Sequence, residues 1–143
     1  MNFEKLLNSK KIEVVETEDR DFSKVDDDLK SAEDNLKLNN FEWTMSISYQ
    51  AVLRASMNLM ALLGYRAIGK EHHKNTFEFL RACELGGDLI DFFDKVRIKR
   101  NEFLYRGIDE VSQSEASEIL VSAKDLVLKI RTFVLKIRTG EKK

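Results

Sequence analysis

Residues 41–63 read FEWTMSISYQAVLRASMNLMALL, and this stretch decides the fold. Its apolar residues begin on one face, at Phe41, Met45, Tyr49 and Val52, and then widen to almost every position in the second half. This widening is typical of a helix that neighbouring elements cover on several sides. At 1.5 Å per residue such a helix is roughly 35 Å long. We therefore expect it to be the central helix of a bundle.

Shorter helical patterns lie on both sides of this segment. Apolar residues at three- and four-residue steps predict helices over residues 3–7, 23–38, 77–85, 88–106 and 114–137. Residues 64–75, GYRAIGKEHHKN, resemble a polar connector, and residues 11–18 include a possible extended stretch. The chain has no proline and six glycines, so nothing forces a break inside a helix. The sequence predicts an all-α, up-and-down bundle of four to five helices.

The length of the chain fits one domain. A sequence of 143 residues can bury one core and is too short for two. We expect residues 1–20 to form a lead-in segment, residues 21–138 the bundle and residues 139–143 a tail. No apolar run approaches the roughly 18 residues needed to cross a bilayer, and the first residues lack a signal-peptide pattern. We expect a cytoplasmic protein without a membrane partner.

The cysteine and the histidines argue against a metal centre. The single cysteine, Cys83, excludes an intramolecular disulfide and a multi-thiolate metal site, and its helical apolar surroundings indicate a buried small hydrophobe. His72 and His73 are adjacent in the predicted connector and make a poor chelate. We expect no metal and no cofactor. For the histidines a surface or capping role is favoured, and the alternative is a substitute catalytic histidine supplied across a dimer.

Charge is distributed unevenly along a nearly neutral chain. The net charge is −1, which argues against indiscriminate binding to nucleic acid. Acidic residues gather between positions 13 and 28, and basic residues gather between 95 and 106 and again between 129 and 143. The late basic residues fit either one surface for an anionic ligand or ordinary solvated helix faces.

The most informative stretch for function is DFFDKVRIKRNEFLYRG, residues 91–107. On a helix, Arg97, Asn101 and Tyr105 fall four residues apart on one face, and Arg100 lies beside them. Two guanidiniums, an amide and a phenol suit a phosphate or a base. The alternative is structural, because such arginines also pair with nearby carboxylates, here Asp91, Asp94 or Glu42.

The order of several segments resembles that of the HEPN superfamily, from about Leu6 to Ile137. The segments are LLNSKKIEVVETE, SAEDNLKLNNFEWTMSISYQAVLRASMNLMALLGYR, EHHKNTFEFL, FDKVRIKRNEFLYRG and VSQSEASEILVSAKDLVLKI. The resemblance implies a four- or five-helix fold, frequent homodimerisation, and nucleotide or RNA binding. In many members it also implies metal-independent ribonuclease activity, often in a toxin that is paired with an antitoxin.

The sequence departs from the signature of those ribonucleases, which is an arginine, a polar residue and then a histidine. Arg100 and Asn101 match the first two positions, but Tyr105 stands where the histidine is expected. A phenol with pKa about 10 would need a shift of about three units, or roughly 4 kcal/mol, to replace an imidazole as a base. No catalytic residue is therefore assigned.

The resulting prediction is a nucleotide- or RNA-binding domain without strong catalysis, which uses Arg97, Arg100, Asn101 and Tyr105 and acts as a homodimer. One alternative is a weak metal-independent endoribonuclease, such as the toxin of a toxin–antitoxin pair, which uses the same residues. A second alternative is a helical protein-interaction module that docks a partner such as a nucleotidyltransferase-type antitoxin.

Overall fold

Helix α3 (Phe41–Leu63) is the centre of the structure, and its bounds match the sequence prediction. The computed structural model describes residues 1–107 and 110–140. Within these residues the other elements are α1 (Glu4–Asn8), β1 (Ile12–Val14), α2 (Ser23–Lys37), β2 (Tyr65–Ala67), α4 (His72–Ala82), α5 (Gly87–Arg106) and α6 (Gln113–Arg138). This architecture confirms the predicted helical bundle.

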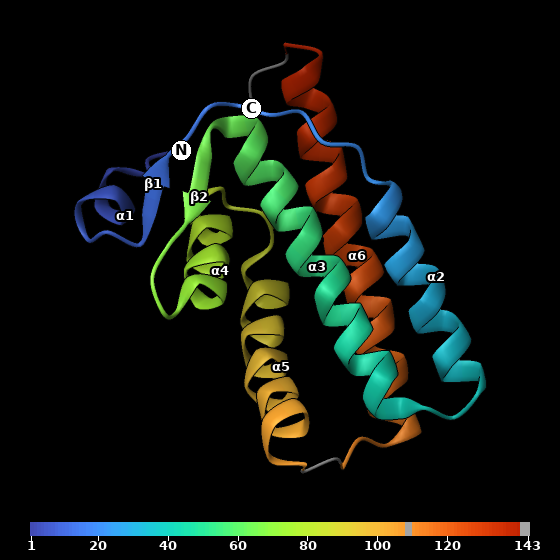
Figure 1. Ribbon diagram of the computed structural model, residues 1–143. Coiled ribbons are helices and arrows are strands. Elements are labelled where there is room, and N and C mark those ends of the chain that lie inside the picture. Colours follow the sequence, from blue (N-terminus) through green and yellow to red (C-terminus); the bar gives the residue numbers. More distant parts are fainter. Residues whose placement is uncertain (108–109, 141–143) are drawn as a thin grey trace.

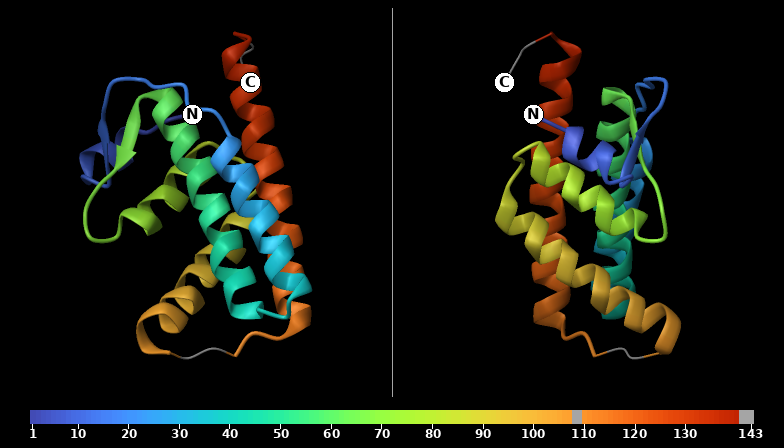
Figure 2. Two further views of the ribbon diagram at one scale, coloured as in Figure 1. Left: turned by 45° about the vertical axis from the view of Figure 1, so that its right-hand side comes forward. Right: turned by 90° about the vertical axis from the view of Figure 1, so that its left-hand side faces the viewer.

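Two groups of helices flank α3. Helices α2 and α6 lie on one side of it, and α4 and α5 lie on the other (Figure 1). Helix α5 crosses the bundle obliquely, whereas α6 stays alongside α3 in each view (Figure 2). Because neighbours cover α3 on several sides, its buried residues include Met45, Tyr49, Val52 and Leu59 from different turns. None of the helices in the described residues is long and apolar enough to cross a membrane.

The predicted polar connector after α3 is partly wrong, because it contains a strand and the start of a helix. Strand β2 pairs antiparallel with β1, with Ile12 opposite Ala67. The chain turns into β2 at Gly64, whose φ of +88° favours glycine and where a Cβ atom would lie 3.2 Å from the carbonyl oxygen of Val15. The pairing joins segments far apart in sequence, so local patterns do not reveal it.

Helix α4 begins at His72, before the predicted start at Phe77. Asn75 and Thr76 look like capping residues in the sequence, since short polar side chains often bond to nearby backbone. In the structure they lie inside the helix. Asn75 Nδ2 donates to the carbonyl oxygen of Ile68 at 2.9 Å, and Thr76 Oγ1 donates to that of His72 at 2.8 Å. Both histidines are therefore placed in the first turn of α4.

A capping box starts α6 and links it to α5. The backbone N–H of Glu115 donates to Ser112 Oγ at 3.1 Å, and the Ser112 N–H donates to Glu115 Oε1 at 3.3 Å. The cap is thus Ser112, two residues before the predicted helix start at Ser114. Lys99 of α5 pairs with Glu115 at 2.7 Å, and this contact is the main cause of the lowered pKa of the Glu115 carboxyl.

Ion pairs between α6 and the segment around α2 engage Arg131 and Arg138 of the late basic cluster, together with Lys124, which precedes it. Arg131 Nη1 pairs with Asp26 at 2.6 Å, Lys124 pairs with Glu33, and Arg138 pairs with Asp19 at 2.7 Å. These contacts support the reading of the described part of that cluster as structural helix faces. Lys142 and Lys143, with most of the expected tail, lie outside the described residues.

Two leucines on α6 test this packing directly. Leu126 is 0% exposed in the core, whereas Leu128, two residues later, is 61% exposed. We expect Leu126→Ala to lower the free energy of unfolding by about 2–5 kcal/mol, because it removes buried methyl groups and leaves a cavity. Leu128→Ala should change it by less than about 0.5 kcal/mol. Urea unfolding followed by circular dichroism measures both, and equal losses would contradict this orientation of α6.

Candidate functional site

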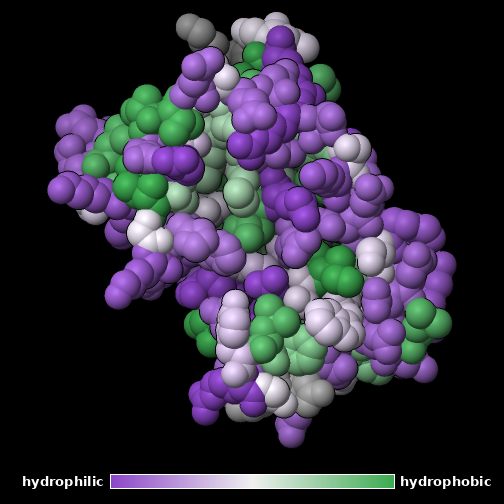
Figure 3. Space-filling view, viewed as in Figure 1, coloured by the Kyte–Doolittle hydropathy of each residue, from purple (hydrophilic) through white to green (hydrophobic). Residues whose placement is uncertain are grey.

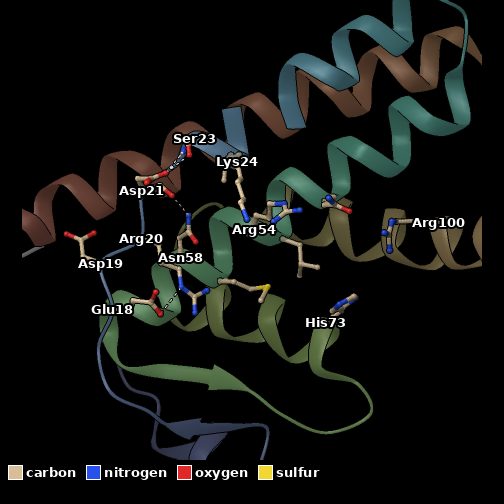
Figure 4. A pocket seen from close by; sticks show the side chains of 14 residues that line it. Glu18, Asp19, Arg20, Asp21, Ser23, Lys24, Arg54, Asn58, His73 and Arg100 are labelled. Atoms are coloured by element: carbon tan, nitrogen blue, oxygen red, sulfur yellow. Dashed lines mark hydrogen bonds and ion pairs between the residues drawn. The ribbon is translucent and has the colours of Figure 1, made fainter. Parts of the chain in front are cut away.

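A cleft of about 820 Å³ crosses the solvent-facing side of α3 and draws side chains from four helices. Lys24 of α2, Gln50 and Arg54 of α3, His73 of α4 and Arg100 of α5 all line it. Figure 4 shows Lys24 and Arg54 close together, with His73 and Arg100 facing the same space from α4 and α5. Residues from distant parts of the sequence thus converge on one cationic region.

Arg100 is held in place by a hydroxyl and an aromatic ring, both of them neutral groups. Its Nε donates to Ser46 Oγ at 3.0 Å, and its guanidinium lies 5.0 Å from the centre of the Tyr49 ring. Among the residues that the structure describes, no carboxylate forms an ion pair with it. The guanidinium is therefore oriented by neutral groups and keeps donors available for a phosphate, which it can bind through two parallel hydrogen bonds.

Tyr49 is the buried support under this arginine. The side chain is 0% exposed, and its ring lies 5.8 Å from that of Phe77 and 6.2 Å from the His73 imidazole. Its hydroxyl is buried and finds no hydrogen-bond partner among the described residues. Burial raises the pKa of the Tyr49 phenol far above its usual range, although the charges of Arg100 and Arg97 oppose the rise. The phenol therefore stays neutral.

His73 shares the cleft with Arg100 and is uncharged at neutral pH. Partial burial lowers the pKa of its imidazole, and the neighbouring His72, Arg100 and Arg97 lower it further. Sequence reasoning left this residue in a connector. No spacing signal links it to Arg100, because the two residues come from different helices and line the same cleft only once the helices are packed. A neutral imidazole beside a guanidinium can accept a proton or a hydrogen bond.

The two ends of the cleft differ in charge. Arg54 pairs with Asp28 at 2.7 Å, and burial is the main cause of the raised pKa of that carboxyl. Lys24 makes no ion pair among the described residues. At the other end the acids are already engaged: Glu18 pairs with Arg20, Asp19 pairs with Arg138, and Asp21 accepts from Ser23. Hydrogen bonds from Ser23, and in smaller part the charge of Lys24, lower the pKa of the Asp21 carboxyl, so Lys24 lies near an acid, whereas Arg100 lies at the opposite end of the cleft (Figure 4).

One of the four site residues that the sequence predicts on α5 lines the cleft. Arg100 lines it, whereas Arg97 Nε donates to Asp94 Oδ1 at 3.0 Å within α5, which is one of the structural pairings expected as an alternative. Asn101 is half-buried, and Tyr105 is 81% exposed in the last turn of the helix. The four share a broad face of α5, but they do not converge on one point in this single chain.

Within the described residues, no group of three or more histidine, cysteine or acidic side chains could hold a metal ion. Cys83 is buried beneath α4, as predicted. The chemistry of the cleft is therefore that of its charged and polar side chains.

Comparison with known proteins identifies the family. A model of the HEPN domain matches residues 22–132. The chain belongs to the HEPN family. No curated protein and no solved structure matches it. The matched region of this HEPN domain runs from the start of α2 into α6, and it contains Lys24, Arg54, His73 and Arg100.

The buried phenol of Tyr49 yields a test of the support under Arg100. A hydroxyl without a partner in the core costs about 1–3 kcal/mol. We expect Tyr49→Phe to leave the free energy of unfolding unchanged or to raise it by about 1 kcal/mol, because the ring under Arg100 is kept. Tyr49→Ala should lower it by about 3–5 kcal/mol. Chemical denaturation measures both. A clear loss in Tyr49→Phe would show that the hydroxyl has a partner.

Proposed function

We propose that this HEPN domain binds nucleotides or RNA in the cleft across α3, with Arg100 as the main phosphate contact. The observation that carries the proposal is the state of Arg100, which is fixed by Ser46 and Tyr49 and lacks a carboxylate partner among the described residues. Lys24 adds a second unpaired cation on the same cleft. Guanidinium and ammonium groups are the usual protein ligands of phosphate.

Binding is favoured over strong catalysis because the position of the missing histidine offers no replacement. Tyr105, which occupies that position, is 81% exposed in the last turn of α5. A phenol here replaces the imidazole of the ribonuclease signature, and its exposure suits it to contact a ligand. Arg97, Asn101 and Tyr105 are assigned a supporting role, as secondary contacts for a ligand that extends along α5.

A second candidate function, weak metal-independent cleavage of RNA, is favoured by the position of His73. Its neutral imidazole lines the same cleft as Arg100. An imidazole near a bound phosphodiester can take the proton of the 2′-hydroxyl, while the guanidinium stabilises the charge that develops on the phosphate. This arrangement lies within one chain, so it does not need a histidine from a partner. A homodimer, and service as a toxin beside an antitoxin, are further proposals that rest on the family.

The decisive substitution is Arg100→Ala. We expect wild-type protein to retain labelled single-stranded RNA, and Arg100→Ala to bind it roughly 10- to 100-fold more weakly, because one charge-assisted contact is lost. The slope of log K against log salt should become shallower by about 0.7. Filter retention at several salt concentrations measures both quantities.

Lys37→Ala is the matched control, since it removes one positive charge at the far end of α2 and should bind like wild type. Gel analysis of the same samples scores chain breaks. Breaks that vanish in both Arg100→Ala and His73→Gln would establish the ribonuclease. If wild type and Arg100→Ala retain RNA equally weakly and neither cuts it, the proposal fails and a protein partner becomes the better hypothesis.

The lowered pKa of His73 predicts how binding depends on pH. A bound phosphate favours the charged imidazole, so the pKa of His73 rises in the complex and binding takes up a proton. The affinity of wild type for RNA should therefore increase about 3- to 10-fold as pH falls from roughly 7.5 to 6, through the usual range of histidine. His73→Gln should lose this increase, and His72→Gln should keep it. Fluorescence anisotropy across this range measures the effect. An unchanged increase in His73→Gln would place the titrating group elsewhere.

A further inference from the structure

Trp43, the sole tryptophan of the chain, lies at the start of α3 with 49% of its surface exposed. It meets the ring of Phe103 on α5 at 5.2 Å in an edge-to-face arrangement. This contact orients the indole and leaves about half of it open to solvent. Figure 3 shows hydrophobic and pale side chains gathered over the lower parts of α3 and α5, next to a hydrophilic strip. An exposed aromatic ring of this size can bind a ligand.

The contacts between α3 and α5 fix where Trp43 lies relative to Arg100. Trp43 touches Phe103, and Ser46 accepts a hydrogen bond from Arg100. Trp43 and Ser46 are three residues apart on α3, and Arg100 and Phe103 are three residues apart on α5. Three residues of helix correspond to a rise of about 4.5 Å. The indole and the guanidinium are therefore about one turn apart on the same seam. Further along α3, Gln50 and Arg54 line the cleft, and Arg54 is roughly 16 Å from Trp43 along the axis.

An aromatic ring followed by cations at these intervals matches the chemistry of a nucleic-acid strand. Every base has a flat face that can stack on an indole, and the phosphate lies one sugar away from its base. The seam from Trp43 to Arg54 is longer than one nucleotide, so a mononucleotide would occupy only part of it. A protein partner fits this surface less well, because no carboxylate forms an ion pair with Arg100 among the described residues, and a guanidinium left in this state favours an anionic ligand.

We propose that Trp43 is a base-stacking subsite beside Arg100, and that the ligand of the cleft is a single-stranded oligonucleotide that lies along α3. This inference rests on the proposed function, since it takes Arg100 as the phosphate contact. It adds a residue that the α5 motif does not contain and a class of ligand longer than one nucleotide.

Because Trp43 is the only tryptophan, its emission reports on this subsite without a label. We expect a short single-stranded RNA oligonucleotide to quench the emission and to saturate with the same affinity as binding measured by anisotropy. Adenosine monophosphate at the same concentrations should give little quenching. The Arg100→Ala variant should need more oligonucleotide to reach the same quenching.

Variants of Trp43 separate stacking from folding. Trp43→Leu should bind a labelled oligonucleotide roughly 5- to 150-fold more weakly, since one stacked base is lost. Trp43→Phe should recover part of the affinity because it keeps a ring. Leu128→Ala, which removes another exposed apolar side chain from the distant α6, is the matched control and should bind like wild type. Circular dichroism confirms that each variant is folded.

Three results would overturn the inference, and they differ from failure of the proposed function. In the first, oligonucleotide binding depends on Arg100, but it does not change the tryptophan emission and Trp43→Leu binds like wild type. This result would show that Trp43 is not part of the site, and it would leave the proposed function standing. In the second, adenosine monophosphate binds with the same affinity as the oligonucleotide, which would contradict a ligand longer than one nucleotide. An emission shift that depends on protein concentration without RNA assigns Trp43 to a protein interface. If no binding of the oligonucleotide depends on Arg100, both proposals are wrong.

Discussion

The candidate site depends on the burial of Tyr49 between three helices. Its ring extends from α3 and meets Phe77 and His73 of α4 on one side and the Arg100 guanidinium of α5 on the other. A bulky ring that is 0% exposed leaves its neighbours little freedom, because protein interiors are close-packed. The same side chain therefore holds an imidazole and a guanidinium at the edge of one cleft. Replacing it with a small residue would disturb the core and the site together.

Ion pairs elsewhere in the bundle engage acidic side chains that could otherwise pair with a cation of the cleft. The net charge is −1, and the acidic segment near α2 is matched by basic residues of α6. Such exposed pairs add little stability, about 0–1 kcal/mol each. Their larger consequence is that they occupy the acids that would otherwise neutralise cations nearby. Arg100 is left without an ion pair among the described residues, on a molecule that is nearly neutral.

The sequence predicted those features that depend on local pattern. The bounds of α3 follow from its apolar spacing and from Gly64, and the burial of Cys83 follows from the pattern around it. The β1–β2 pairing was missed because it depends on a contact between distant segments. The sequence also could not predict that Arg97 forms an ion pair and that Arg100 does not. Both lie on one face of α5, and only the neighbouring Asp94, Ser46 and Tyr49 decide which guanidinium is paired and which is free.

Burial shifts the pKa values of Tyr49, beneath the cleft, and of His73, in its lining, in the same sense, so that each neutral form is favoured. It raises the pKa of the Tyr49 phenol and lowers that of the His73 imidazole. A guanidinium keeps its positive charge in proteins. The cleft therefore combines a permanent positive charge with an imidazole whose neutral form is favoured, and we propose that this imidazole takes up a proton when an anion binds. Such a pair serves binding whenever the proton comes from solvent, and it serves catalysis only if a 2′-hydroxyl is placed within hydrogen-bond distance of the imidazole. The position of the ligand, more than the identity of the residues, thus separates the two candidate functions.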